Sequence, residues 1–309
     1  MTVPVILEVL EQNPEVEIDV LTRPFTAKLY PNHPRLHAIG VDVDKKYKGF
    51  FGVRRLSSEL KLNDYDSIAD LHFVLRSRLI TRFLKKGKSV AQMDKGRDEK
   101  KALTQKGNKV RGALRPMTER YADVFRNLGL NVELSHELKN SNTREDAIGF
   151  APFAQHQGKA WPERHARELL SLLNKEGQTV KLFGGPDEVT KLEKLADGLE
   201  HVSLHKGSGI QSDIESMKSL KVMISMDSAN MHLASLAGTP VISIWGATHP
   251  DAGFMGYGQK VENAVQIPVE ELACRPCSVF GNVPCHRGDW ACMERLEPIK
   301  VVETLKSID

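Results

Sequence analysis

Residues 225–232, Ser-Met-Asp-Ser-Ala-Asn-Met-His, have types and a spacing that suit a site for a phosphate-bearing ligand. They follow an apolar, β-rich run and precede a small-residue run that ends at Gly238, which predicts a strand, a turn and a helix. Asp227 or Ser228 can cap this helix, whose free N–H groups and positive dipole end suit phosphate oxygens. The alternative is that both residues only cap the helix and that His232 is a satisfied packing histidine.

Two further charged residues lie near the ends of other expected strands. Lys159 lies in Ala-Pro-Phe-Ala-Gln-His-Gln-Gly-Lys-Ala-Trp-Pro, residues 151–162, and Glu188 ends Phe-Gly-Gly-Pro-Asp-Glu, residues 183–188. A lysine close to a helix N-terminus can stabilise the charge of a bound anion. The alternatives are an exposed lysine before a helix and an acidic residue that stabilises the first turn of its own helix.

All four cysteines of the chain fall in one stretch, with the spacing Cys-x2-Cys-x7-Cys-x6-Cys. Four thiolates that include a Cys-x2-Cys pair can form a tetrahedral zinc site. Such sites usually have two tight pairs, which this spacing lacks. Two interpretations therefore stay open, reduced and partly buried thiols or a structural zinc held by Cys274, Cys277, Cys285 and Cys292.

A basic region occupies residues 76–120, with fifteen Lys/Arg against four Asp/Glu in a chain of net charge +3. Such a region suits an anionic partner, either an acidic, phosphorylated glycan or nucleic acid. Residues 84–120 contain no aromatic side chain on which bases could stack, which argues against nucleic acid. A solvated helix face with a mobile loop is the alternative. The expected contacts to an anionic acceptor are Arg76, Arg78, Lys100, Lys101 and Arg111.

The composition is that of an ordinary globular enzyme. The chain has 309 residues, 40% of them hydrophobic, and no run of eighteen apolar residues that could span a bilayer. Residues 3–10 include Pro4 and Glu8 and follow no basic leader, so they do not predict a signal peptide. We expect two α/β domains and a cytosolic protein.

Apolar β-rich runs alternate with helical patterns along the chain, which predicts βαβ units and parallel sheets. The polar residues 135–145 are the expected linker between two such halves. In the first half we expect a mobile loop at residues 95–112, strands at 16–21, 36–41, 67–71 and 88–92, and helices at 3–12, 54–62, 75–84 and 116–128. In the second half we expect strands at 147–152, 179–183, 201–204, 222–225 and 241–245, and helices at 162–175, 187–199, 211–219, 228–237 and 297–308.

These segments, in their order, resemble glycosyltransferase family 9, the heptosyltransferases of lipopolysaccharide assembly. Residues 227–232 resemble the family's Asp-[Ser/Thr]-x-x-x-His turn, residues 151–162 its loop that ends in Lys-x-Trp-Pro, and residues 183–188 its strand-end loop with an acidic residue. Trp-Gly-Ala-Thr-His-Pro at residues 245–250 and Cys-Arg-Pro-Cys at residues 274–277 resemble its late motifs. The resemblance covers nearly all of the second half and is weaker in the first.

The resemblance implies an α/β protein of the GT-B type, with two Rossmann-like, doubly wound parallel-sheet domains that face a cleft. Residues 1–140 would form the acceptor-side domain, residues 141–296 the donor-binding domain, and residues 297–309 a helix that packs back on the first domain. It further implies an inverting, metal-independent transfer of heptose from ADP-heptose to a lipopolysaccharide-core acceptor. The enzyme would be a cytoplasmic monomer, peripheral at the inner membrane.

The resemblance also assigns roles to residues. Lys159 and Asp227 would be catalytic, Lys159 by neutralising the phosphate charge of the donor as the bond breaks. Asp227 and the N–H groups of Ser228 and Ala229 would hold the diphosphate and the sugar, and Glu188 would accept a hydrogen bond from the ribose. The whole donor site would comprise Ala154, Gln155, Lys159, Glu188, Asp227, Ser228, Ala229 and His232. No cofactor would be required for catalysis.

Other polar residues carry less information. Asp-Val-Asp at residues 42–44 has the Asp-x-Asp pattern with which metal-dependent glycosyltransferases bind manganese, but so short a pattern often arises by chance, and we reject it. His72, at the end of an expected strand, can line the cleft or pack beside it. His249 is a candidate for the donor side.

The family's opening strand and Gly-Asp motif, whose Asp is taken as the catalytic base, have no counterpart here. The chain begins Met-Thr-Val-Pro, which resembles the part that follows this Asp. We expect the first strand and the base to lie upstream of Met1. Two alternatives to glycosyl transfer remain: a non-catalytic or truncated nucleotide-sugar-binding remnant, and a basic nucleic-acid-binding protein.

Overall fold

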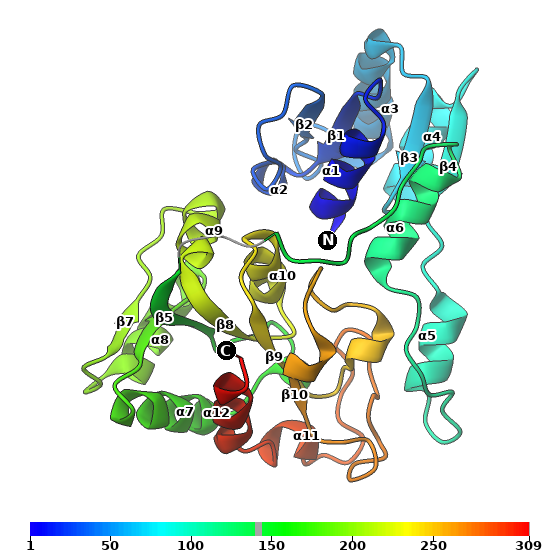
Figure 1. Ribbon diagram of the computed structural model, residues 1–309. Helices are drawn as coiled ribbons and strands as arrows, with labels where there is room; N and C mark the ends of the chain where they lie inside the picture. Colours follow the sequence, from blue (N-terminus) through cyan, green and yellow to red (C-terminus); the bar gives the residue numbers. More distant parts are fainter. Residues whose placement is uncertain (140–143, 309) are drawn as a thin grey trace. The chain divides into compact units, whose positions relative to one another are not determined.

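The computed structural model describes residues 1–139 and 144–308, and Figure 1 shows their course. The chain divides into two compact units. Unit 1 consists of Met1–Lys95 and Met117–Ser135, and unit 2 of Gly96–Pro116 and His136–Asp309. None of the helices in the described residues combines the length and the apolar character needed to cross a membrane.

Unit 1 has parallel strands that alternate with helices, as expected for an α/β domain. Its strands are β1 (Ile18–Thr22), β2 (Leu36–Gly40), β3 (Ser67–Asp70) and β4 (Ser89–Gln92). Its helices are α1 (Thr2–Gln12), α2 (Pro24–Ala27), α3 (Gly49–Leu60), α4 (Leu75–Leu84) and α6 (Met117–Arg126). The strands pair as β1 with β2 and β3 with β4, so the described residues of unit 1 form two short parallel sheets.

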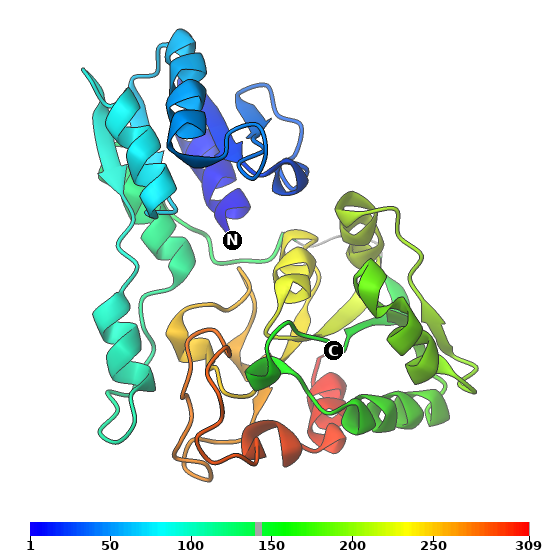
Figure 2. The same ribbon diagram turned by 180° about the vertical axis from the view of Figure 1, so that it is seen from behind.

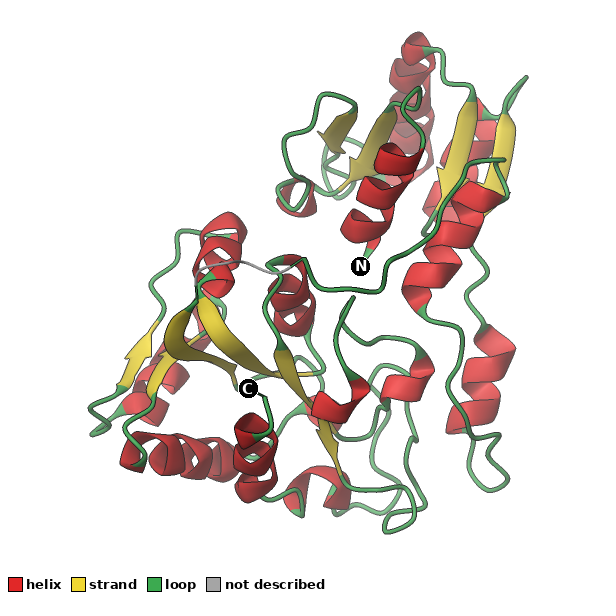
Figure 3. Ribbon diagram, in the orientation of Figure 1, coloured by secondary structure: helices red, strands yellow, loops and turns green. Residues whose placement is uncertain are grey.

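Unit 2 is built on one parallel sheet of order β10-β9-β8-β5-β6-β7, whose strands are drawn in yellow in Figure 3. Its strands are β5 (Glu145–Ala151), β6 (Thr179–Leu182), β7 (Val202–Leu204), β8 (Leu220–Met226), β9 (Val241–Trp245) and β10 (Ala264–Gln266). Its helices are α5 (Arg97–Thr104), α7 (Glu163–Lys175), α8 (Val189–Ala196), α9 (Ile210–Lys218), α10 (Ala229–Leu236), α11 (Ala291–Glu294) and α12 (Pro298–Lys306).

The strand order creates a switch point between β5 and β8, which are neighbours in the sheet. The chain leaves β5 toward β6 and leaves β8 toward β9, on the opposite side. Ligands of open α/β sheets bind in the crevice that such diverging connections leave at the carboxyl ends of the strands. The loops after β5 and β8 are therefore where a site is expected.

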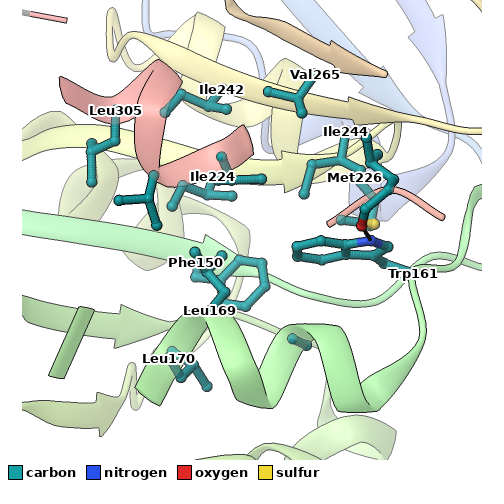
Figure 4. Close-up of a cluster of buried hydrophobic side chains, with 14 of the residues drawn as sticks. Phe150, Trp161, Leu169, Leu170, Ile224, Met226, Ile242, Ile244, Val265 and Leu305 are labelled. Atoms are coloured by element: carbon teal, nitrogen blue, oxygen red, sulfur yellow. Dashed lines mark hydrogen bonds between the residues drawn. The ribbon is translucent and has the colours of Figure 1, made fainter. Parts of the chain in front are cut away.

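Both faces of this sheet are buried, because side chains alternate along each strand. On one face Phe150, Ile224 and Ile244 pack against Leu169 of α7 and Leu305 of α12, as Figure 4 shows. The other face carries Ala151, Met223 and Trp245 under α9 and α10. In the first cluster the indole Nε1–H of Trp161 donates to the carbonyl of Leu296 at 2.9 Å, which ties the loop after β5 to the segment before α12.

The C-terminal helix belongs to unit 2. Helix α12 packs on α7 within unit 2, and Nζ of Lys306 lies 2.8 Å from Oε1 of Glu176. Figures 1 and 2 both show the two helices side by side. The apolar side of α12 is used by the core of unit 2, and the expected packing of residues 297–309 on the first domain stays a prediction.

The expected mobile loop at residues 95–112 contains a helix instead, α5, which belongs to unit 2. Its sequence has few apolar residues, but Leu103 is 1% exposed and Nζ of Lys100 lies 4.7 Å from the ring centre of Phe254. A single anchoring leucine gives no helical periodicity to read, so only tertiary packing reveals this helix. Of the expected linker at residues 135–145, residues 140–143 lie outside the described part.

Candidate functional site

The switch point of unit 2 brings together the two residues expected to be catalytic. Lys159 ends the short 3-10 turn Gln157–Lys159 after β5, and Asp227 follows β8 directly. Their side chains form an ion pair, with Nζ of Lys159 2.8 Å from Oδ2 of Asp227. The Lys159 side chain is 17% exposed and that of Asp227 is 5% exposed. Both side chains are thus largely shielded from water. Electrostatic interactions are stronger in such an interior environment than in water.

Asp227 does not act as a helix cap, which was the alternative for this motif. The N-cap residue of α10 is Ser228, with φ −142°. Within the described residues, no side-chain hydrogen bond caps the start of this helix. The hydroxyl of Ser228 instead lies 3.3 Å from that of Ser225. The first N–H groups of α10, which begin at Ala229, are left to a ligand or to water.

His232, one turn into α10, is not the satisfied packing histidine of the alternative interpretation. Its Nδ1 atom is buried and has no hydrogen-bond partner among residues 1–139 and 144–308. Burial lowers the pKa of His232 to about 3, and the nearby charge of Lys159 acts in the same direction. The imidazole is therefore neutral at pH 7.

The side chain of Glu188 caps its own turn. It ends the 3-10 turn Pro186–Glu188, and its Oε2 accepts a hydrogen bond from the N–H of Gly185 at 2.7 Å. Phe183 follows β6 and His205 follows β7, and their rings stack with centres 4.7 Å apart. Of the other expected donor contacts, Ala154 packs partly against the core and Gln155 is exposed in the loop after β5.

The expected basic region is divided between the two units. Arg76 and Arg78 are exposed on α4 of unit 1, whereas Lys101 and Arg111 are exposed in unit 2. Lys100 is 6% exposed and its Nζ lies over the ring of Phe254, and its expected contact to an acceptor stays a prediction. Its position on the face of α5 that carries Leu103 buries its stem, which the sequence pattern does not indicate.

All four cysteines are free thiols of unit 2, with Cys292 buried and the other three partly exposed. Among the described residues no group of three or more His, Cys, Asp or Glu is placed to hold a metal ion. Burial raises the pKa of Cys292 to about 12, and burial with the neighbouring Cys274 also raises the pKa of Cys277. These two side chains are therefore protonated thiols at neutral pH.

Asp42 and Asp44, rejected as metal ligands, make local contacts. Oδ1 of Asp42 accepts hydrogen bonds from the N–H groups of Asp44 and Lys45, at 3.2 and 2.9 Å. Asp44 pairs with Arg23 at 3.1 Å. The ring of His72 has a pKa lowered mainly by burial. His249 caps the turn Pro250–Ala252 by accepting from the N–H of Asp251, at 3.2 Å.

The sequence analysis missed Arg275, although it lies in the Cys-Arg-Pro-Cys motif. Its side chain is 0% exposed, and burial lowers its pKa to about 10, which still leaves it charged at pH 7. The guanidinium donates to the carbonyl oxygens of Trp245, Gly246, Thr248 and Ile267 and to the side chain of Gln266. The spacing of the cysteines predicted only a metal site or thiols, and it gave no indication that Arg275 is buried.

Comparison with known proteins relates the chain to one family. The model of "Glycosyltransferase family 9 (heptosyltransferase)" matches residues 53–281, most of the chain. "Lipopolysaccharide heptosyltransferase 1" of Escherichia coli strain K12 is 24% identical over 292 residues, 88% of this chain and 90% of that protein. The enzyme of the same name from Salmonella typhimurium is 31% identical over 127 residues, 40% of this chain and 39% of that protein.

Two solved structures share the fold. "E. coli heptosyltransferase WaaC with ADP" has a TM-score of 0.70 at 20% identity and covers 100% of this chain and 95% of its own. "Structure of E. coli ADP-heptose lps heptosyltransferase II" has a TM-score of 0.64 at 19% identity, with coverages of 99% and 93%. The fold is therefore α/β of the GT-B type, as the sequence predicted.

Proposed function

The chain belongs to glycosyltransferase family 9, and on that premise we propose that it transfers heptose from ADP-heptose to a lipopolysaccharide-core acceptor. The transfer inverts the anomeric carbon and needs no metal ion. Relatives named as lipopolysaccharide heptosyltransferases, and related structures that hold ADP or an ADP-heptose analogue, support the donor. The enzyme works in the cytoplasm as a monomer, peripheral at the inner membrane.

The ion pair of Lys159 with Asp227 is the observation that carries this proposal. It holds a cation at the switch point of the sheet, beside the N-terminus of α10, where the diphosphate of a nucleotide sugar is expected to bind. A lysine and a helix N-terminus together supply positive charge without a divalent ion. The two residues lie on different loops, so their meeting is a property of the folded unit.

In the proposed reaction, an acceptor hydroxyl oxygen forms a bond to the anomeric carbon and loses its proton to solvent. The bond from that carbon to the diphosphate oxygen breaks, so negative charge grows on the diphosphate. Lys159 moves from Asp227 to the phosphate oxygens and stabilises this charge. The N–H groups of Ser228 and Ala229 donate to the same oxygens. Asp227, released from Lys159, accepts hydrogen bonds from the sugar hydroxyls. The preorganised charge is thus used most fully in the transition state, which is what lowers the barrier.

The remaining donor contacts follow from position. Glu188 accepts from the ribose with the carboxylate that also caps its own turn. Ala154 and Gln155 flank the entrance in the loop after β5, and the neutral ring of His232 lines the base of the site. On the acceptor side, the exposed Arg76 and Arg78 of unit 1 and Lys101 and Arg111 of unit 2 attract the phosphates and acidic sugars of the acceptor.

The test is a mass-spectrometric screen of nucleotide sugars with a lipopolysaccharide-core acceptor, followed by NMR of the anomeric configuration of the product. We expect ADP-heptose to be consumed, the configuration to invert and EDTA to leave the rate unchanged. The matched variant Lys159→Gln should lose transfer. Tight binding of ADP-heptose with no transfer to any acceptor would instead identify a nucleotide-sugar-binding protein without activity.

For the four cysteines we propose reduced thiols, with structural zinc as the alternative that a metal analysis decides. Without a metal ion, burial raises the pKa of Cys277 and of Cys292 and favours their protonated form, whereas zinc would bind them as thiolates. Protein purified without added metal should contain much less than one zinc per chain and should titrate with four thiols. One tightly held zinc per chain would establish the alternative.

A further inference from the structure

Three loops of unit 2 meet at the backbone next to Lys159, where two of them hydrogen-bond to Gly158 in the third. They are residues 156–159, residues 245–248 after β9, and residues 274–281, which we name the 274–281 loop. The N–H of Ala247 donates to the carbonyl of Gly158 at 2.8 Å, and the N–H of Gly158 donates to the carbonyl of Gly281 at 3.2 Å. The backbone next to Lys159 is thereby held from both sides.

Gly281 forms the floor under the lysine side chain. A Cβ atom at this position would lie 2.6 Å from Cγ of Lys159 and 3.2 Å from its Cε. The residue also has φ +74°, in the left-handed region that favours glycine. The hydroxyl of Ser278 accepts the N–H of Gly281 at 2.8 Å and so holds this turn of the 274–281 loop. Only a residue without a side chain leaves the stem of Lys159 where it is.

Arg275 holds the loop at residues 245–248. Nε donates to the carbonyl of Gly246 at 2.5 Å, and Nη2 to the carbonyls of Trp245 at 3.3 Å and Thr248 at 3.1 Å. These carbonyls flank Ala247, whose own carbonyl accepts the N–H groups of Cys277 at 3.0 Å and Ser278 at 3.1 Å. The guanidinium therefore fixes the residue that bonds to Gly158.

Burying the charge of Arg275 costs free energy that packing alone does not repay. Its acceptors in the described residues are neutral oxygens, and removing a cation from water costs several kcal/mol unless its hydrogen bonds are replaced in full. The five donors of a planar guanidinium suit several carbonyls at fixed angles, whereas an ammonium group has three. An arrangement of this kind yields a rigid loop, and the rigid loop lies against the residue before Lys159.

We propose that Arg275 and Gly281 are positioning residues for Lys159, whose stem they hold so that its ammonium group can pass from Asp227 to the diphosphate. This inference rests on the proposed function for its catalytic consequence, but not for its structural one. It gives the 274–281 loop a role that its cysteines do not explain. Small misplacements of a catalytic group cost large factors in rate, so a supporting loop can control kcat without touching the donor.

The test compares Gly281→Ala with Gly288→Ala. Gly288 lies in the same part of the chain, has φ +78° and has no atom within 4 Å of a Cβ built on it. Both variants therefore meet the same backbone strain, but only Gly281→Ala meets Lys159. We expect Gly281→Ala to lower kcat at least tenfold with a smaller change in KM, and Gly288→Ala to stay within twofold of the wild type.

A second pair of variants tests the role of Arg275. Arg275→Lys keeps the charge and loses the planar donors, and Arg287→Lys is its control, since Arg287 is an exposed residue that pairs with Asp289 at 2.8 Å. We expect kcat to fall for Arg275→Lys alone. In a Lys159→Gln background, Gly281→Ala and Arg275→Lys should change the residual rate less than twofold, because both act through Lys159. A fall as large as in the wild type would overturn the positioning role.

A readout independent of transfer separates the two proposals. Acetylation of the Lys159 ammonium by an amine-reactive ester, followed by peptide mass spectrometry, should be several-fold faster in Gly281→Ala and Arg275→Lys than in their controls. If the wild type transfers no sugar but this pattern appears, the proposed function fails and the positioning stands. If the wild type transfers heptose and all four variants match it in labelling and kcat, the positioning role is refuted.

Discussion

The ammonium group of Lys159 and the carboxylate of Asp227 meet at 2.8 Å, although one follows β5 and the other β8. Adjacent strands whose connections diverge place these loop ends side by side. In the structure each residue neutralises the other, and in the proposed reaction the diphosphate of the donor takes the place of Asp227 at Lys159. The pair is therefore both a structural contact and the expected point of entry of the donor.

Lys159→Gln tests the catalytic charge. The variant keeps hydrogen-bonding capacity but cannot stabilise the charge that grows on the leaving diphosphate. We expect kcat to fall by about 10²- to 10³-fold, the typical effect of removing one preorganised electrostatic contact. Steady-state rates of ADP release measure it. Lys175→Gln, at the exposed end of α7, is the control, and an unchanged rate for Lys159→Gln would remove the residue from the mechanism.

Asp227→Asn separates binding of the nucleotide from binding of the sugar. Because Asp227 competes with the diphosphate for Lys159, we expect the Kd of ADP to stay the same or to fall. The KM of ADP-heptose should rise about ten- to hundredfold, the value of hydrogen bonds to a charged group. Calorimetry with ADP and rate measurements with the sugar nucleotide give the two values. Equal losses for both ligands would show that Asp227 does not contact the sugar.

His232 makes stability depend on pH in the acid range. Its folded pKa of about 3 lies below the ordinary value of 6.5, so the unfolded chain binds a proton that the folded chain does not between these values. Stability is therefore lost as pH falls below 6.5, by about 1.4 kcal/mol per pH unit from this group. Urea midpoints measured from pH 7 to pH 4.5 should fall less steeply in His232→Gln. His201→Gln, at an exposed histidine, should keep the wild-type slope, and parallel curves for all three proteins would contradict the assignment.

Cys292 should resist alkylation in the native protein. With burial raising its pKa to about 12, its thiolate fraction at pH 8 is lower than that of a free cysteine by a factor on the order of a thousand. Iodoacetamide labelling followed by peptide mass spectrometry should therefore modify Cys285, which is partly exposed, long before Cys292. Denaturation in urea should remove the difference. Equal rates in the native state would indicate an ionised or mobile Cys292.

The alternation of apolar runs with helical patterns is local information, and it predicted the α/β class and most elements. The helix expected at residues 75–84 is α4 as the structure has it, and the strand expected at residues 241–245 is β9. The motif at residues 227–232 also stood out, because capping residues, small residues and a final glycine follow one another within the chain. Short elements without periodicity, such as α5 and β10, were missed or taken for loops.

Partners distant in the chain could not be predicted in this way. The sequence placed Lys159 and Asp227 in one site only through a resemblance, and it left open whether Asp227 caps α10 or pairs with another group. The strand order of unit 2 decided this, because hydrogen bonds between β5 and β8 set which loops are neighbours. The same holds for Lys100, whose stem packs on Phe254, and for Arg275, whose acceptors come from a different loop.

The sequence by itself thus determined the class of the fold, the sequence of its elements and the residues able to bind a phosphate. The tertiary structure alone decided which of those residues meet, which are buried and which loop supports them. The physical reason is that periodicity and capping act over a few neighbouring residues. The Lys159 ion pair and the Arg275 hydrogen bonds instead depend on strand pairing and on packing between segments far apart in the chain.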